Sequence, residues 1–347
     1  MKKTIALLCS AVIIILLCGC DGQSSLQKFT DYSFDYFDTA TTIIGYETDR
    51  ETFNKNCEII KSELEKYHKL FTIYNRYDGL NNLCEVNRQH SELQVDSKIT
   101  ELVEFSRQMY NVTNGRVNIA MGSVLKLWHD CRDRASSDPT DAHLPSMEAL
   151  KAAAEHTDIS KVELNKEKST ICLPDTLQRL DVGAVAKGYA VECVAQWMLD
   201  KGISGYMLNV GGNVRAVGKR ADGKRWDVGI ENPDTADQQS PYIEYIALED
   251  MSLVISGDYQ RFYYVDGKRY HHIIDPDTLM PAEYFRSVSV ICKDSGVADA
   301  LSTALFCMSY EQGVEVAKSQ GVEVMWVLPD GSKRYTDGFK KYVTKPL

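Results

Sequence analysis

Two adjacent histidines have the chemistry to act as a general base. His271 and His272 are followed closely by Asp275 and Pro276. A histidine beside a reacting hydroxyl can serve as a general base, which contributes roughly 10²–10⁴ in rate. If both lie in a strand, their side chains face opposite sides, so only one can enter a given site. The alternative is a pair of structural or exposed histidines, and the adjacent spacing disfavours metal binding by both.

A carboxylate and a hydroxyl, Asp299 and Thr303, are four residues apart in a predicted helix. That spacing places both on one helical face. Such oxygen ligands suit Mg²⁺, which also takes ligands from phosphates, and they suit Mn²⁺ as well. The alternative is an Asp that interacts with the helix dipole and a Thr that bonds back to its own helix.

Two glycine-bearing segments could let the backbone approach a ligand. Residues 181–189 (DVGAVAKGY) form a short turn that leads into a helix predicted to start near Ala184. Free N–H groups at such a helix start attract phosphate, and Lys187 would add a point charge. A tight turn with a solvated lysine is the alternative. Residues 208–213 (LNVGGN) follow a strand, and their two glycines favour a sharp hairpin over a ligand contact.

Apolar residues at helical spacing predict the elements that would position these segments. Residues 53–71 indicate a helix of about five turns, and residues 97–112 a second helix with Ser97 as its N-cap. Shorter or later helices are predicted over residues 145–155, 184–200, 297–308 and 311–319. The charged, proline-containing stretch 131–145 is predicted to be a surface excursion.

Strand-like runs dominate the second half of the chain. Strands are predicted over residues 34–46, 205–210, 226–230, 242–248, 253–256, 261–265, 287–292 and 322–328. Helices cluster first and antiparallel-looking strands follow, so we expect an α+β fold. We find no internal repeat and no linker that would separate two independent domains.

Composition excludes some classes of function. The chain has 347 residues and a formal net charge of -10, which disfavours nucleic acid as a partner. An acidic protein that binds an anion must concentrate positive potential locally, through a cation, a lysine or backbone N–H groups. The seven cysteines after residue 20 are scattered and include no CxxC pair, which argues against a zinc site or a dense disulfide framework. We expect Cys193, Cys292 and Cys307 to be buried free thiols.

The N-terminus is typical of a targeting segment. Lys2 and Lys3 precede an apolar run of about thirteen residues, the length of a signal-peptide core and too short for a membrane span. The run ends in Leu-Cys-Gly-Cys20, which resembles a lipobox. We therefore predict a lipoprotein signal peptide over residues 1–19, lipidation of Cys20, a tether over residues 20–32 and one catalytic domain over residues 33–343. An ordinary secretory signal is the alternative.

Taken together, these segments resemble the FAD:protein FMN transferase (ApbE) family. Eight pieces occur in the family's order, over nearly the whole mature chain. They are FDTATT (37–42), LFTIYN (70–75), Trp128 after Asn114-Gly, DVGAVAKGYAV (181–191), LNVGGN (208–213), SGDY (256–259), HHIIDP (271–276) and ADALSTA (298–304). One piece alone would be a weak signal, but eight in order after a lipobox are specific.

The resemblance implies a detailed site. The fold would be α+β, with two subdomains, a mainly antiparallel sheet and FAD bound between the subdomains. Mg²⁺ would be bound by the carbonyl of Ala184 and the side chains of Asp299 and Thr303, and His272 would be the proton acceptor. The residues that match the FAD site are Thr39, Tyr74, Asp181, Lys187, Ser256, Gly257 and Asp275.

The resemblance also implies a reaction and partners. FMN would pass from FAD to a Thr or Ser hydroxyl of an acceptor, with release of AMP. The acceptor would be a flavoprotein subunit of a membrane redox complex or a dedicated flavin-binding domain, and the enzyme would be lipid-anchored on the extracytoplasmic side of the plasma membrane. Two alternatives are a lipoprotein that hydrolyses or stores FAD, and a non-catalytic solute-binding or scaffold lipoprotein.

Two positions depart from the family pattern. Asn118 stands where the family usually has Asp, and Leu279 stands where it has Gly after the HHIIDP piece. Leucine does not easily adopt positive φ. We therefore expect the loop beside the site, and with it the choice of acceptor, to differ from the family pattern.

Overall fold

A sheet of eight antiparallel strands forms the centre of the fold in the computed structural model, which describes residues 26–234, 236–237 and 239–344. The strand order is β1-β2-β6-β7-β10-β13-β14-β15. A three-stranded sheet (β16-β9-β8), a small sheet (β3-β5-β4) and the β11–β12 hairpin complete the strands. The α+β prediction with a mainly antiparallel sheet is confirmed.

The bounds of the elements are as follows. The strands are β1 (Gln27–Tyr36), β2 (Thr39–Glu47), β3 (Leu93–Gln94), β4 (Glu163–Asn165), β5 (Thr170–Cys172), β6 (Tyr206–Val210), β7 (Asn213–Val217), β8 (Trp226–Glu231), β9 (Tyr242–Leu248), β10 (Ser252–Gly257), β11 (Phe262–Val265), β12 (Lys268–His271), β13 (Ser287–Cys292), β14 (Glu323–Val327), β15 (Lys333–Tyr335) and β16 (Val343–Thr344). The helices are α1 (Arg50–Phe71), α2 (Leu83–Gln89), α3 (Ser97–Val112), α4 (Gly122–Ser137), α5 (Met147–Ala154), α6 (Ala186–Asp200), α7 (Ser295–Phe306) and α8 (Tyr310–Gln320), with short 3-10 turns η1 (Pro139–Asp141), η2 (Ile159–Lys161) and η3 (Phe339–Lys341).

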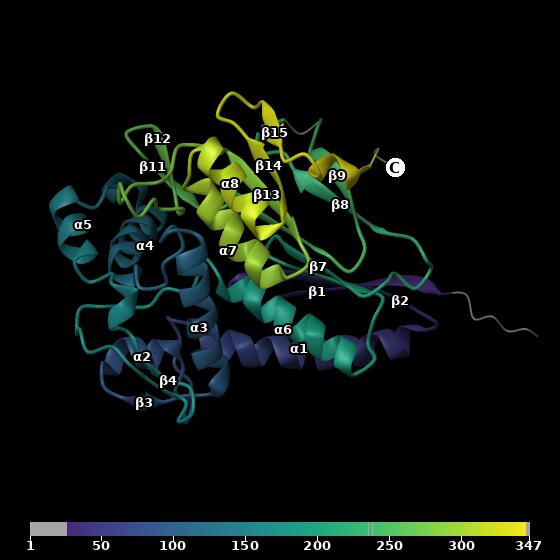
Figure 1. The fold of residues 1–347 in the computed structure, drawn as a ribbon, viewed down its shortest axis with the longest axis horizontal. Coiled ribbons are helices and arrows are strands. Elements are labelled where there is room, and N and C mark those ends of the chain that lie inside the picture. Colours follow the sequence, from purple (N-terminus) through teal and green to yellow (C-terminus); the bar gives the residue numbers. More distant parts are fainter. Residues whose placement is uncertain (1–25, 235, 238, 345–347) are drawn as a thin grey trace, which may run out of the picture.

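The large sheet is buried on both faces. In β14, Val324 and Trp326 belong to the core that α1, α6 and α7 share with the sheet, while Met325 and Val327 pack with β8 and β9. This alternation follows from the two-residue period of a strand. Figure 1 shows α1, α6 and α7 on one side of the sheet. A smaller core lies between α4, α5 and the β11–β12 hairpin.

Helices α6 and α7 approach each other closely at Gly188. A Cβ at this position would lie 2.3 Å from the Cβ of Asp299 and 2.3 Å from the carbonyl oxygen of Ser295. One turn further along α6, a carboxylate oxygen of Glu192 accepts the N–H of Ser295 at 2.8 Å and also pairs with the fully buried Arg215. The start of α7 is therefore fixed against α6, which sets the position of Asp299.

Most of the predicted helices are confirmed, with corrections at their ends and in one segment. The N-cap of α3 is Asp96, whose side chain accepts the N–H of Lys98, and not Ser97. The surface excursion predicted for residues 131–145 is wrong over residues 131–137, which form the end of α4. The many charged residues of this segment hid the helical pattern in the sequence, because the apolar face of α4 is narrow and packs only against the smaller core.

The N-terminal predictions are partly corrected. The single strand predicted over residues 34–46 is a hairpin of β1 and β2, which turns at Phe37 and Asp38 with φ of 55° and 51°. The tether predicted for residues 20–32 is wrong from residue 27 onward, because β1 begins there. The signal peptide and Cys20 lie outside the described residues. None of the helices in the described part of the chain is long and apolar enough to cross a membrane.

The seven cysteines in the described residues are all free thiols. Cys307, at the end of α7, is buried as predicted, and its Sγ lies 3.8 Å from the carbonyl oxygen of Ile274. Cys193 and Cys292 are only partly buried, which corrects the prediction for those two residues.

We predict that Gly188→Ala lowers the free energy of unfolding by about 1–3 kcal/mol, the usual cost of overpacking a core. The added methyl would force α6 and α7 apart. Denaturant midpoints measure the effect. Gly313→Ala is the matched control in α8, because its Cβ would meet its nearest neighbour, a ring atom of Trp326, at 3.3 Å. Equal losses in both variants would contradict the prediction.

Candidate functional site

A cavity of about 770 Å³ opens where α1, α4, α6 and α7 meet the β1–β2 turn, the β6–β7 turn and the segment after β12. These segments are far apart in the sequence, and the sheet brings them together. Nine of the predicted site residues line the cavity: Thr39, Tyr74, Asp181, Ala184, Lys187, Ser256, His272, Asp299 and Thr303.

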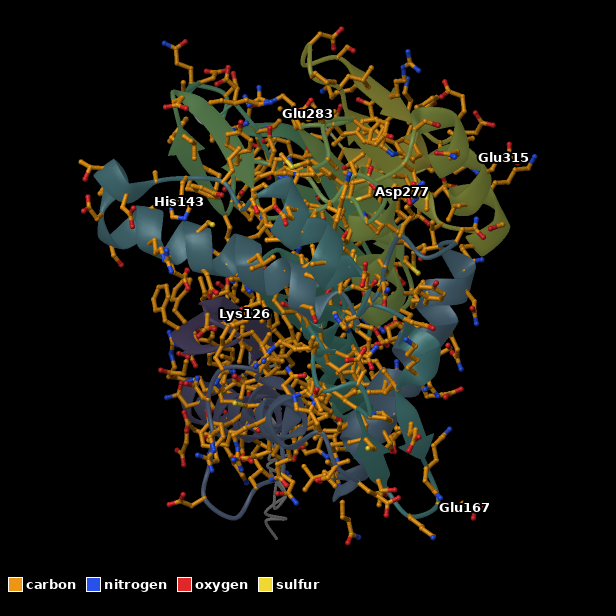
Figure 2. All side chains as sticks on the ribbon, turned by 90° about the vertical axis from the view of Figure 1, so that its left-hand side faces the viewer. Lys126, His143, Glu167, Asp277, Glu283 and Glu315 are labelled. Atoms are coloured by element: carbon orange, nitrogen blue, oxygen red, sulfur yellow. The ribbon has the colours of Figure 1, made fainter. Side chains whose placement is uncertain are left out.

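Two predicted site residues do not line the cavity, although each supports one that does. A Cβ on Gly257 would lie 2.4 Å from the ring of Tyr259, so this glycine makes room for an aromatic side chain that lines the wall. The Asp275 carboxylate is buried and accepts a hydrogen bond at 3.0 Å from Arg116, which does line the wall. Arg116 also pairs with Asp277, which is labelled in Figure 2.

The two histidines face different surroundings, although only His271 lies in strand β12 and His272 follows its end. His271 is buried, with Nε2 at 2.8 Å from the carbonyl oxygen of Ala282 and Nδ1 accepting the N–H of Ile273. His272 lines the cavity, and its Nδ1 lies 3.2 Å from the carbonyl oxygen of Arg261. A carbonyl can only accept, so Nδ1 carries the proton and Nε2 has the free lone pair.

The surroundings keep His272 neutral. Removal from water, followed by the positive charge of Arg261, lowers the pKa of His272 to about 3. An imidazole with a free Nε2 and no charge at neutral pH can accept a proton. This arrangement fits a general base.

Asp299 and Lys187 form a second cluster. One Asp299 oxygen accepts the N–H of Gly188 at 2.8 Å, and the other lies 3.8 Å from the Lys187 ammonium. Burial raises the pKa of the Asp299 carboxyl, and the nearby Lys187 opposes this shift. With its amide nitrogen toward Asp299, the buried Asn213 bridges the pair, donating at 3.3 Å and accepting from Lys187 at 3.0 Å.

The oxygen atoms near this cluster fit a hard divalent cation. Ala184, Asp299 and Thr303 line the same cavity, and the Ser256 hydroxyl lies 3.5 Å from that of Thr303. Among the described residues, no group of three or more His, Cys, Asp or Glu side chains could hold a metal ion. A single carboxylate with neutral oxygens suits Mg²⁺, which commonly completes its shell with water and substrate phosphates.

The start of α6 offers fewer free N–H groups than the sequence predicts. The helix begins at Ala186 and not near Ala184. The N–H groups of Val185 and Ala186 bond to the carbonyl of Val182, and that of Gly188 bonds to Asp299. Side-chain cations therefore supply more of the positive potential than we expected.

Several lining residues were missed by the sequence analysis. Besides Lys187, which was predicted, three cationic side chains line the cavity: Arg116, Arg132 and Arg261. Their spacing along the chain gives no signal, since their meeting depends on the tertiary fold. His129 on α4 was also missed. Its Nδ1 lies 3.2 Å from the Tyr74 hydroxyl and 3.9 Å from an oxygen of Asp181.

The β6–β7 hairpin approaches the β1–β2 turn at Gly211. This glycine and Gly212 have φ of 56° and 88°, so the predicted hairpin is confirmed. A Cβ on Gly211 would lie 2.4 Å from the hydroxyl oxygen of Thr39. Both interpretations of this segment, a hairpin turn and a close approach to a ligand, are therefore compatible with the structure, because the two glycines form the turn and also line the cavity.

The two departures from the family pattern are accommodated in different ways. The Asn118 amide donates to the carbonyl of Thr157 at 2.8 Å, a bond that a carboxylate could not make. Leu279 adopts φ of 60°, so the expectation that leucine would avoid this conformation is wrong. A left-handed residue costs about 1–2 kcal/mol. Leu279 is buried, and its carbonyl accepts the indole N–H of Trp128 at 3.0 Å.

Comparisons with known proteins agree on one family. The ApbE family pattern matches residues 36–326. An FAD:protein FMN transferase of Vibrio cholerae is 31% identical over 343 residues, which cover 96% of this chain and 97% of that protein. The crystal structure of the ApbE protein of Thermotoga maritima is 26% identical and superposes with a TM-score of 0.81, covering 92% of this chain and 100% of that one. The structure of the flavin transferase ApbE of Vibrio cholerae is 26% identical and superposes with a TM-score of 0.74, covering 91% of this chain and 99% of that one.

We predict that His272 makes folding stability depend on acidic pH. Its folded pKa of about 3 lies below the ordinary 6.5, so the unfolded state binds the proton more tightly. Stability should therefore fall as pH decreases from about 6.5 toward 3. Urea denaturation at pH 7 and pH 5 should show a larger loss in the wild type than in His272→Gln, which cannot titrate. The same loss in both proteins would be inconsistent with a depressed pKa.

Proposed function

The chain belongs to the ApbE family and is an FAD:protein FMN transferase, and from this premise we propose the details of its reaction. It transfers the FMN part of FAD to a Thr or Ser hydroxyl of an acceptor protein, depends on Mg²⁺ and releases AMP. The acceptor is a flavoprotein subunit of a membrane redox complex or a dedicated flavin-binding domain.

One observation supports this chemistry above all others. A single cavity contains a neutral histidine with a free Nε2 and the oxygen atoms of Ala184, just before α6, and of Asp299 and Thr303 on α7. The first group suits removal of a proton from a hydroxyl. The second suits a cation that binds a diphosphate. Both accelerate attack of a hydroxyl on a phosphoanhydride.

His272 would act on the acceptor hydroxyl. Its Nε2 takes the proton while the hydroxyl oxygen bonds to the phosphorus of the FMN part, and the bond from that phosphorus to the AMP oxygen breaks. An anionic diphosphate beside Arg261 would offset the charge that lowers the pKa of His272. Substrate binding would therefore make His272 a stronger base than it is in the free protein.

Cationic side chains would bind and orient the diphosphate. Lys187 and Arg261 line the cavity, and among the described residues Arg261 has no carboxylate within ion-pair distance. Ala184, Asp299 and Thr303 would hold Mg²⁺, which when bound neutralises charge on the breaking phosphoanhydride. Fixed donors of this kind stabilise charge that develops in the transition state.

We also propose that a lipid on Cys20 anchors the enzyme to the extracytoplasmic face of the plasma membrane. The lipobox-like sequence supports this proposal. Because β1 begins at Gln27, only a short segment would separate the lipid from the folded domain. Detergent phase partitioning should then place the wild type in the detergent phase and Cys20→Ser in the aqueous phase, and a wild type in the aqueous phase would refute the anchor.

Intact-mass spectrometry tests the proposed reaction. The chain from Asp21 onward is mixed with FAD, Mg²⁺ and a candidate acceptor domain, and an FMN-sized increase on a Ser or Thr of the acceptor is expected. His272→Ala should slow transfer by roughly 10²–10⁴ while FAD still binds. His143→Ala, at a partly exposed residue labelled in Figure 2 and outside the cavity lining, is the control. Release of FMN and AMP without transfer would indicate a hydrolase, and unchanged turnover would remove His272 from its role.

We predict that Asp299→Asn abolishes the response of activity to Mg²⁺. The amide oxygen can still accept the N–H of Gly188, so the contact between α6 and α7 remains while the charge is lost. Activity measured across a Mg²⁺ titration tests this, with thermal denaturation as a check on folding. A normal metal response in a folded Asp299→Asn protein would mean that the ion binds elsewhere.

A further inference from the structure

Tyr74 is an exposed aromatic residue at the wall of the cavity. It follows the end of α1, and 59% of its surface is accessible to solvent. Its hydroxyl lies 3.2 Å from Nδ1 of His129, and the two ring centroids are 6.2 Å apart. Partial burial raises the pKa of Tyr74 to about 12. The Tyr74 hydroxyl lies within hydrogen-bond distance of Nδ1, and an imidazole protonated on Nε2 would accept the phenol proton there.

His129 is positioned by a rigid neighbour. It lies on α4 directly after Trp128, whose indole is buried in the smaller core and donates to the carbonyl of Leu279 at 3.0 Å. Removal from water lowers the pKa of His129, and the carboxylate of Asp181 opposes this shift. His129 is therefore held in place by a helix, whereas Tyr74 lies beyond the end of one, and we take Nδ1 as the acceptor of the Tyr74 hydroxyl.

We propose that His129 is a positioning residue that holds the Tyr74 ring in place as an aromatic wall for one of the two planar rings of FAD. The inference rests on the proposed function, because FAD supplies the rings. An exposed tyrosine with a free hydroxyl would lose side-chain freedom when a ring stacks on it. The bond to His129 restricts that freedom before the ligand arrives, and such preorganisation strengthens binding.

The proposed contribution of His129 to FAD binding depends on Nδ1, the nitrogen that lies beside the Tyr74 hydroxyl. Loss of a single hydrogen bond in His129→Ala or Tyr74→Phe should weaken FAD binding about three- to tenfold. Turnover at saturating FAD should change little, since neither group faces the reacting atoms in this proposal. His129→Asn places an oxygen near the position of Nδ1 and should restore affinity. His129→Gln extends further, toward the position of Nε2, and should not.

Flavin fluorescence and calorimetry with the purified soluble chain test the proposal. The double variant His129→Ala/Tyr74→Phe should bind FAD no more weakly than either single variant, because both remove the same bond. Additive losses, or no rescue by Asn, would overturn it. FMN and AMP as separate probes distinguish the flavin ring from the adenine ring, since only the ligand that stacks on Tyr74 should lose affinity.

Failure of this inference can be distinguished from failure of the proposed function. If the wild type binds FAD and transfers FMN but His129→Ala binds FAD equally well, only the role of His129 is wrong. If the wild type does not bind FAD with Mg²⁺ present, the proposed function fails, and this inference fails with it.

Discussion

The close contact of α6 with α7 at Gly188 is the constraint on which the site depends. Because this residue has no side chain, the Asp299 carboxylate can accept a backbone N–H from α6 and stay near Lys187. One turn later in α6, the Glu192 carboxylate makes a second contact with α7 by accepting the N–H of Ser295, and it also accepts a hydrogen bond from Arg215. A carboxylate, an ammonium and a helix start thus share one small volume, and each partly compensates the cost of burying the others.

The sheet brings the remaining parts of the site to this helix pair. Antiparallel strands place the β1–β2 and β6–β7 turns side by side, so the Thr39 hydroxyl lies against Gly211. The β11–β12 hairpin brings His272 back to Arg261, and the carbonyl of Arg261 fixes which imidazole nitrogen is free. The base and the oxygen cluster are therefore positioned by different parts of one rigid scaffold, an arrangement that suits a reaction between two separate molecules.

Sequence patterns predicted what local chemistry determines and missed what tertiary contacts determine. Apolar periodicity located α1 and α7. Only one of the two adjacent histidines lines the cavity, as expected, but His272 follows the end of β12 and does not lie in the strand. His129 and Asn213 were missed as site residues because each is functional only through partners far away in the chain. Leu279 was misjudged for a related reason, since burial and the bond from Trp128 offset a conformation that leucine alone avoids.

The buried thiol of Cys307 could report on opening of the segment that follows His272. Its thiol lies beneath the segment after His272, close to the carbonyl of Ile274, and burial raises the pKa of the Cys307 thiol. Only a thiolate reacts readily with alkylating agents. Labelling of Cys307 therefore requires that this segment lift away from α7. The rate at which an alkylating agent modifies Cys307 would measure how often this segment opens, without an engineered cysteine or fluorophore.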